Sequence, residues 1–405
     1  MNARTLSRGF AAIALAATVL AVAMTAPAGG TPITSGPATT DPPTAAAYAG
    51  RWLAAQVGAD GSVAVGGSPS PGATLQTALA LATAGVDRPT FERTVGWLTA
   101  HVDTVTGTGA SADAGAVGYL LLVATAAGMT PTSFGGVDLV ARLAGTLGTW
   151  NHTTDPGLYG PGDPTYDGTF RQSIAVLGLL AAGAPVPAAA VAWLTDRQCG
   201  TSDPMIRGGW EPYRLAADAC TAGDPTAFTG VDTNDTAIAA TALTAVGTPP
   251  AIDPLAWFGQ VQNSTGGWGY LAGLPDDPNS DALVIQALAA LGAHPPTGWA
   301  KAGGTPFTSL LGFQLGCAAA PADQGAFTFP GTDGAPNALA TEQAVWGAMA
   351  RPFPLSGVSF TDAPVPCQVP VTTVPGVTTT VPVTTTSTPG AGAATPVNVT
   401  PAFTG

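Results

Sequence analysis

Six segments of the chain are apolar on nearly every side, begin at a polar residue and, in five cases, end at a glycine. The run Ile238-Ala239-Ala240-Thr241-Ala242-Leu243 shows the pattern, which leaves no face for solvent. A polar start and a glycine end are typical helix termini. We therefore expect an inner layer of helices at Thr74–Gly85, Asp113–Gly128, Thr169–Gly183, Asp232–Gly247, Ser280–Gly292 and Asn337–Arg351.

A second class of segment alternates with the first and has one apolar face, with pairs such as Trp52-Leu53, Trp97-Leu98 and Trp193-Leu194. We expect outer helices at Ala46–Val57, Pro89–Val102, Val137–Leu147, Pro187–Cys199, Asp253–Gln262 and Thr305–Cys317. Helical pairs at intervals of about 40–60 residues cannot bury their apolar faces alone. An open array needs polar terminal repeats, which this chain lacks. The predicted fold is all-α, an (α/α)6 toroid of six inner and six outer helices.

The connector after an outer helix carries a recurring pattern. Gln262 precedes Gly266-Gly267-Trp268, and Gln198 precedes Gly208-Gly209-Trp210. Weaker forms follow the first and last outer segments, at Asp60-Gly61-Ser62-Val63 and Gly325-Ala326-Phe327. Glutamine can bond the unsatisfied end of a neighbouring helix, glycine permits the turn, and tryptophan covers the helix end. We interpret the pattern as scaffold.

These Gln…Gly-x-Trp units and alternating helices resemble the QW repeats of squalene-hopene cyclases, over residues 44–352. The resemblance implies the terpene cyclase/prenyltransferase α/α-toroid superfamily, which includes prenyltransferase β-subunits and transcobalamin-like corrinoid binders. Asp232-Thr233-Asn234-Asp235-Thr236-Ala237 is similar to the acidic motif of class II cyclases, whose third residue is the proton donor. Here that residue is Asn234, and an amide cannot deliver a proton. If the chain is an enzyme, Asp232 and Asp235 are the expected catalytic residues; as an alternative, both only cap a helix.

Each inner segment has a polar residue near its start. Because inner helices of a closed toroid run parallel, these residues should form a ring that binds the polar part of a ligand, with apolar residues below it. Six unrelated helix caps are the alternative. The candidate ligand-binding residues are Gln76, Asp113, Gln172, Asp235, Asp281 and Gln343.

Two other chemistries have partial signals in the sequence. Glycoside hydrolases also use six-fold α/α barrels, and Asp113, Asp235 and Asp281 could supply the two carboxylates they need. A row of sugar-stacking aromatics is missing, because the inner segments offer mainly Tyr119, Phe170 and Trp346. Asp277-Pro278-Asn279-Ser280-Asp281 opens like a calcium loop but lacks its glycine and distal glutamate. We expect no metal and no cofactor.

Composition narrows the function further. Charged residues make up 9% of the chain and the net charge is −13, which opposes nucleic-acid binding. Four cysteines suggest an oxidising compartment, and we favour Cys199–Cys220 and Cys317–Cys367 among three pairings. The three histidines lie far from any cysteine in the sequence, so zinc is disfavoured.

The two ends of the chain suggest export. Residues 1–28 have the basic start, apolar run and small-residue cleavage site of a signal peptide. Residues 29–43 form a linker, 44–352 the toroid, 353–370 a closing segment, and 371–405 a Thr/Pro-rich stalk. The final Pro401–Gly405 is similar to a sortase signal but lacks the hydrophobic segment and basic tail that should follow it. The alternative is a disordered secreted tail.

We expect a secreted or cell-wall-associated monomer, with attachment through the C-terminal tail. On this interpretation it is non-catalytic and binds a hydrophobic or amphiphilic small molecule, isoprenoid or corrinoid-like, at the cell envelope. The alternative is a divergent terpene cyclase or prenyltransferase-type enzyme. Export and the 12 basic residues argue against that alternative, because diphosphate substrates are intracellular and need a positive clamp.

Overall fold

The computed structural model describes residues 37–148, 156–160, 168–214, 218–227, 229–293, 298–362 and 364–367. All of them belong to one of the chain's two units, which begins at Ser35. The predicted signal peptide, most of the linker and the Thr/Pro-rich stalk lie outside the described residues.

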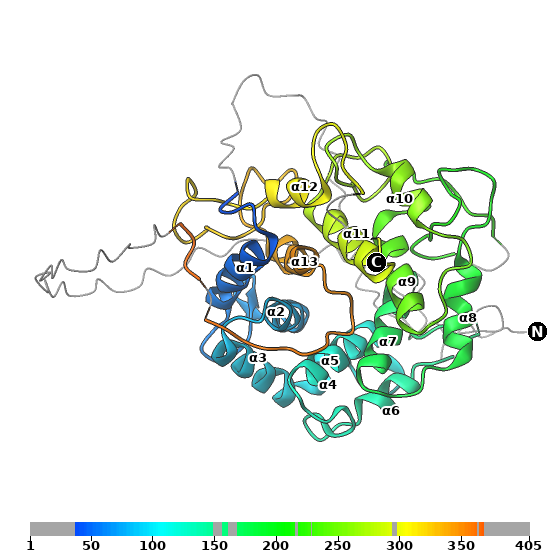
Figure 1. The fold of residues 1–405 in the computed structure, drawn as a ribbon. Helices are drawn as coiled ribbons and strands as arrows, with labels where there is room; N and C mark the ends of the chain where they lie inside the picture. Colours follow the sequence, from blue (N-terminus) through cyan, green and yellow to red (C-terminus); the bar gives the residue numbers. More distant parts are fainter. Residues whose placement is uncertain are drawn as a thin grey trace, which may run out of the picture. The chain divides into compact units, whose positions relative to one another are not determined.

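Six helices form the inner layer, as the sequence predicts. Each packs against the next, and α13 packs against α2, so the ring is closed (Figure 1). The closure confirms the toroid and excludes an open array. The inner helices are α2 (Pro71–Ala84), α5 (Ala114–Ala126), α7 (Thr169–Ala181), α9 (Thr233–Ala245), α11 (Pro278–Ala290) and α13 (Ala338–Met349).

The outer layer alternates with the inner one along the chain (Figure 1). It consists of α1 (Pro42–Gln56), α3 (Arg88–Ala100), α6 (Leu139–Ala144), α8 (Ala188–Arg197), α10 (Leu255–Val261) and α12 (Pro306–Gly312). Several are shorter than expected: Asp138 caps α6, which therefore begins only at Leu139, and α12 ends at Gly312 instead of Cys317. Shorter elements are α4 (Val102–Thr106), the 3-10 turns Gly109–Ser111 and Pro131–Ser133, and a hairpin of β1 (Ala64–Val65) with β2 (Ser68–Pro69).

The fourth residue of five inner helices holds the loop that precedes its helix. At this position a side-chain oxygen accepts a backbone N–H from the loop, at 2.9 Å for Thr236 from Trp210 and 2.6 Å for Asp281 from Trp268. A buried N–H without a partner would be costly, so the bond fixes the loop to the inner layer. In the same way, Thr74 accepts from the N–H of Val63, Gln172 from that of Tyr159, and Thr341 from that of Phe327.

The connector glutamines join neighbouring repeats. The Nε2 of Gln262 donates to the carbonyls of Gly266 and Trp299, the second of which lies ahead of the next outer helix. Gly266 has a φ of +97°, and an added Cβ would lie 2.6 Å from the carbonyl oxygen of Gly304. Only glycine fits both demands. The scaffold interpretation of the connector is confirmed.

The last connector closes the ring. The Nε2 of Gln314 donates to the carbonyl of Ala45 in α1 at 2.8 Å and to that of Gly325 in its own connector at 3.1 Å. The first and last repeats are thus joined by the same bond that joins repeats elsewhere. In addition, Thr77 of α2 donates to the Glu342 carboxylate of α13 at 2.7 Å.

The segment after α13 crosses the end of the ring where the inner helices terminate (Figure 1). Thr361 pairs with Val86 just after α2, and Phe360 packs on Phe91 of α3 at 4.9 Å between ring centroids. A disulfide from Cys367 to Cys317 ties the segment to the loop after α12. Cys199 pairs with Cys220, so the structure has the two pairings favoured from the sequence.

Among the described helices, none combines the length and the apolar character needed to cross a bilayer.

Replacing Gln314 with alanine should lower the free energy of unfolding by about 1–3 kcal/mol, because two buried carbonyls lose their donor. Gln56→Ala is the matched control, since Gln56 is exposed and bonds only to Trp52 in its own helix. That change should cost no more than about 0.5 kcal/mol. Urea unfolding measures both, and equal losses would contradict the closing role of Gln314.

Candidate functional site

An aromatic cluster lies inside the ring of helices. Tyr119 of α5 lies 6.2 Å from Trp346 of α13, and Trp346 makes an edge contact with Phe353 at 5.3 Å, all between ring centroids. Because α2 lies between α5 and α13 in the ring, Tyr119 and Trp346 can meet only on its inner side. We call Tyr119, Trp346 and Phe353 the aromatic plug. It lies on the side of the inner helices where we expected an apolar ligand to bind.

Asp232 and Asp235 form a buried carboxyl pair at the start of α9. The Asp232 side chain caps the helix by accepting the N–H of Asp235 at 2.8 Å. Burial, together with the neighbouring Asp235, raises the pKa of Asp232 well above its usual value. Burial raises the pKa of Asp235 to about 6, while hydrogen bonds from Asp232 and the Phe170 backbone hold it down. Protonated Asp232 therefore donates to ionised Asp235.

Glu342 of α13 is a third buried carboxyl group, 2% exposed. Burial raises the pKa of Glu342 to about 8, against a partial lowering by the hydrogen bond from Thr77. The pKa of Tyr119 is raised by burial and by the nearby Glu342 charge. Glu342 thus lies beside the aromatic plug and is mostly protonated at neutral pH.

Several polar side chains near the starts of the inner helices have a buried oxygen atom with no hydrogen-bond partner. We call this set the polar rim; it lies in the first two turns of α2, α9, α11 and α13. Buried polar atoms are nearly always paired, so unpaired ones mark a place where a ligand or water can bind. The members are Gln76, Asn234, Asp235, Asn279, Asp281 and Gln343.

The structure separates the six predicted ligand-binding residues into two groups. Gln76, Asp235, Asp281 and Gln343 belong to the polar rim; in Asp281 one oxygen accepts the Trp268 N–H and the other has no partner. Gln172 instead binds only backbone groups, accepting from Tyr159 and donating to Gly157 and Ala190. Asp113 caps α5 and pairs with Arg171 at 3.5 Å.

Sequence reasoning missed Asn279, Glu342 and Phe353. We expected one ligand-binding residue in each inner helix and chose Gln343 in the last, which left out its neighbour Glu342. The carboxyl group of Glu342, inside an otherwise apolar segment, was the signal that could have identified it. Phe353 could not be found from the helical pattern, because it reaches the plug from the segment after α13.

Two hollows lie elsewhere on the described surface. One of about 680 Å³ is lined by Asp60, Pro69, Arg93, Trp97, His101 and neighbouring residues. The other, of about 320 Å³, lies beside α6. Neither is lined by the carboxyl groups or the aromatic plug.

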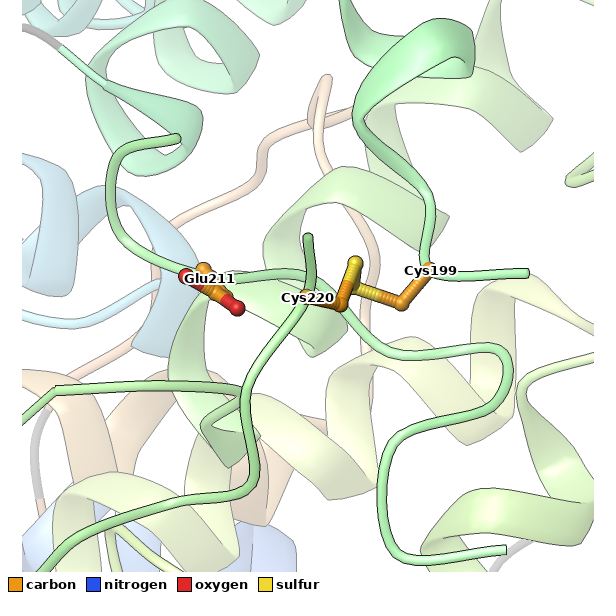
Figure 2. A group of neighbouring side chains, drawn as sticks. All are labelled: Cys199, Glu211 and Cys220. Atoms are coloured by element: carbon orange, nitrogen blue, oxygen red, sulfur yellow. A yellow bond between two sulfur atoms is a disulfide. The ribbon is translucent and has the colours of Figure 1, made fainter. Parts of the chain in front are cut away.

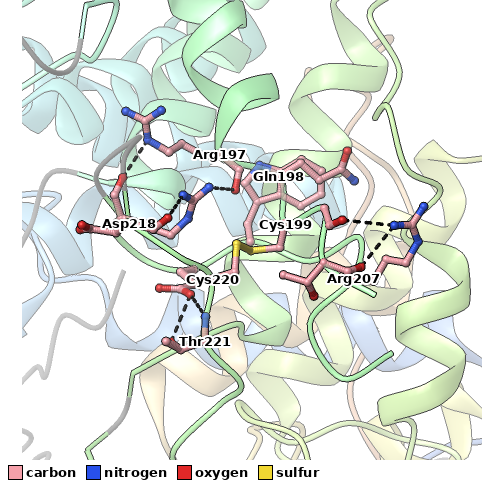
Figure 3. Close-up of a disulfide and its surroundings, with 12 residues drawn as sticks. Arg197, Gln198, Cys199, Arg207, Asp218, Cys220 and Thr221 are labelled. Carbon is pink, nitrogen blue, oxygen red and sulfur yellow. Dashed lines mark hydrogen bonds between the residues drawn. A yellow bond between two sulfur atoms is a disulfide. The ribbon is translucent and has the colours of Figure 1, made fainter. Parts of the chain in front are cut away.

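One group of three potential metal ligands occurs among the described residues: Cys199, Glu211 and Cys220, whose ligand atoms lie within 4.8 Å of one another (Figure 2). Both sulfur atoms are consumed by the disulfide, and the Glu211 carboxylate accepts the Thr221 N–H and hydroxyl. Arginine side chains brace the same loops, with Arg207 donating to the carbonyls of Gly200 and Thr201 (Figure 3). The group is therefore a structural support for the loop that leads to Asp232.

No family model and no curated protein matches the chain. Among solved structures, an alpha-1,6-mannanase from Salegentibacter sp. HEL1_6 is 11% identical over 77% of this chain and 99% of its own, with a TM-score of 0.45. A protein from Actinoplanes is 16% identical over 76% and 98%, with a TM-score of 0.45. An unsaturated glucuronyl hydrolase variant is 12% identical over 76% and 95%, with a TM-score of 0.47. At these identities the likeness concerns the fold alone.

These neighbours correct the predicted family. The two enzymes among them are α/α-toroid glycoside hydrolases, not terpene cyclases or prenyltransferases, so assignment to the terpene cyclase/prenyltransferase superfamily was wrong. The physical reason lies in the connectors. Their glutamines, glycines and tryptophans meet the demands of ring closure and have no part in a reaction, so they identify the architecture without identifying the family.

The predicted function and partner were wrong as well. Neither the non-catalytic binding of an isoprenoid or corrinoid-like molecule nor the alternative terpene cyclase agrees with the glycoside hydrolase neighbours. One mannanase structure holds alpha-1,6-mannotriose, a carbohydrate and not a hydrophobic small molecule. In this chain the aromatic plug lies inside the ring, where we expected an apolar cavity, and the unpaired buried oxygens make the polar rim the candidate site.

The raised pKa of Glu342 predicts a pH-dependent stability. Between pH 4.5 and about 8 the folded state retains a proton that the unfolded state has lost, so stability falls as the pH rises through this window. Glu342→Gln should remove a decline on the order of a few kcal/mol between pH 6.5 and 9. Urea unfolding across this range is the measurement, with exposed Glu92→Gln as the control. Parallel curves for the wild type and Glu342→Gln would contradict the assignment.

Proposed function

We propose that this chain is a carbohydrate-processing enzyme that hydrolyses a glycosidic bond at the polar rim. The observation that carries the proposal is the placement of two buried carboxyl groups near the starts of inner helices, Asp235 in α9 and Glu342 in α13, 1% and 2% exposed. Burial raises the pKa of both, to about 6 for Asp235 and about 8 for Glu342. At neutral pH one is mainly a carboxylate and the other mainly a carboxylic acid. Glycoside hydrolysis requires such a pair.

The roles follow from the protonation states. Glu342 is the general acid that protonates the departing glycosidic oxygen, and its proton is held near Tyr119 at the edge of the aromatic plug. Asp235 is the carboxylate on the opposite face of the sugar ring. There it activates a water molecule or attacks the anomeric carbon directly. Asp232 is a positioning residue, because its protonated carboxyl group donates to Asp235 and fixes the orientation of that carboxylate.

The aromatic plug forms the apolar floor of the site. Tyr119 is its partly exposed member, whereas Trp346 is buried behind it, and sugars pack their C–H faces against exposed rings such as that of Tyr119. The unpaired oxygens of Gln76, Asn234 and Gln343 accept hydrogen bonds from sugar hydroxyl groups. The solved neighbours share only the architecture, so the proposal rests on the side chains of this chain.

The same proposal places the enzyme outside the cell, secreted or bound to the cell wall. Residues 1–28 read as a signal peptide, and the two disulfides suit an oxidising compartment. An exported hydrolase acts on a polymer that cannot enter the cell. Edman sequencing or mass spectrometry of the protein recovered from culture medium and cell walls tests both export and the cleavage point.

Asp235→Asn and Glu342→Gln should each lower kcat by about 10²–10⁴-fold, because each removes an acid or base from the reaction. A reducing-sugar assay over a panel of polysaccharides identifies a substrate for the wild type, and the variants are then measured on it. Exposed Glu92→Gln, on α3, should leave activity unchanged. Circular dichroism must show all three variants folded. Full activity in both site variants would refute the proposed roles.

The pH profile of kcat/KM should be bell-shaped. Activity rises as Asp235 ionises near pH 6 and falls as Glu342 loses its proton near pH 8. In Glu342→Gln the residual activity should lack the alkaline limb. An alkaline limb that persists in this variant would assign the acid to another residue.

A further inference from the structure

The inner layer is almost without positive charge. Arg171 is the one basic residue in the six inner helices, and it is paired with Asp113. Against it stand six acidic residues in these helices or at their caps: Asp113, Asp232, Asp235, Asp277, Asp281 and Glu342. The inner helices therefore offer a ligand at the polar rim one cation, Arg171, and this cation already has an acidic partner.

Burial already makes the negatively charged forms of the acidic residues at this site unfavourable. Burial is the main cause of the raised pKa at Asp232, Asp235 and Glu342, so added negative charge there is poorly solvated. A carboxylate or sulfate on a ligand would share that poorly solvated environment without a positive partner.

The unpaired atoms of the rim are hydrogen-bond acceptors. Asp235 is 1% exposed, and Asn279 and Gln343 are each 8% exposed, yet each has an oxygen atom without a partner. Acceptors of this kind bind hydroxyl or ammonium groups and repel carboxylate or sulfate oxygens.

We propose that the polar rim selects glycans without acidic groups, composed of neutral or amino sugars, and excludes uronic acids and sulfated sugars. The inference rests on the proposed function and narrows its substrate class. Hydroxyl groups satisfy the rim oxygens, and the ammonium group of an amino sugar pairs with Asp235. A glycan that differs only by a carboxylate in place of one hydroxymethyl group loses the contact of that hydroxyl and gains repulsion.

The test separates binding from hydrolysis. Full-length Glu342→Gln protein is applied to a glycan array that includes neutral, amino, uronic and sulfated oligosaccharides. The best neutral ligand is then compared by calorimetry with the same oligosaccharide in which the terminal C6 hydroxymethyl is oxidised to a carboxylate. We expect the oxidised form to bind at least about tenfold more weakly, a difference that adding salt reduces.

A matched pair of variants tests whether the rim causes the selectivity. Gln76→Lys places a cation at the rim and should narrow or reverse the preference against the oxidised glycan. Gln56→Lys makes the same change of charge on the exposed outer face of α1 and should leave the preference unchanged. Equal effects of the two variants would mean that overall charge, not the rim, sets the selectivity.

The remaining outcomes separate the two proposals. If protein without a rim lysine bound the oxidised glycan more tightly than the neutral one, the proposed substrate class would be wrong, but the proposed hydrolysis would not be affected. Binding of neutral glycans without hydrolysis by the wild type would uphold the class and refute the enzyme. Failure of every glycan on the array to bind would overturn both.

Discussion

The architecture depends on one recurring hydrogen bond, between a loop N–H and a side-chain oxygen in the first turns of an inner helix. Five repeats use it, with threonine, glutamine or aspartate as acceptor. Inner helices built of alanine and leucine offer few polar anchors, so this one acceptor per helix determines where the loop lies. The loop in turn carries a glycine that packs against the start of the next outer helix and a tryptophan that donates to a carbonyl of the preceding one.

The same constraint shapes the candidate site. Polar residues near the start of one inner helix have different roles: in α11, Asp281 holds a loop through one of its oxygens, while Asn279 makes no such bond and keeps an unpaired oxygen. In α9, Thr236 makes the loop bond, so Asp235 is free of that task and contributes to a carboxyl pair with Asp232. Polar residues of the inner layer that do not bind a loop can contact a substrate instead. Only a few positions in this apolar layer hold such residues.

Much of the fold could be predicted from the sequence, because six segments without a polar face must be buried and their caps are explicit. Thr233–Ala245, for instance, lies within the predicted Asp232–Gly247, with Asp232 as its cap. The site could be predicted only in part. Gln172 and Gln343 look alike in sequence, yet Gln172 bonds three backbone groups whereas Gln343 has an unpaired oxygen. Which side of a buried helix a residue faces is not encoded when all sides are apolar.

The ring closure also affects how the chain can fold. The Thr77–Glu342 bond joins residues 265 apart in sequence, and the Gln314–Ala45 bond joins residues 269 apart. A chain that emerges N-terminus first must therefore keep the apolar sides of α1 and α2 uncovered until its last helix arrives. Contacts of such long range slow folding and lengthen the exposure of apolar surface. A toroid of this kind needs its final repeat, and any truncation that removes α13 leaves α1, α2 and α11 each with an uncovered face.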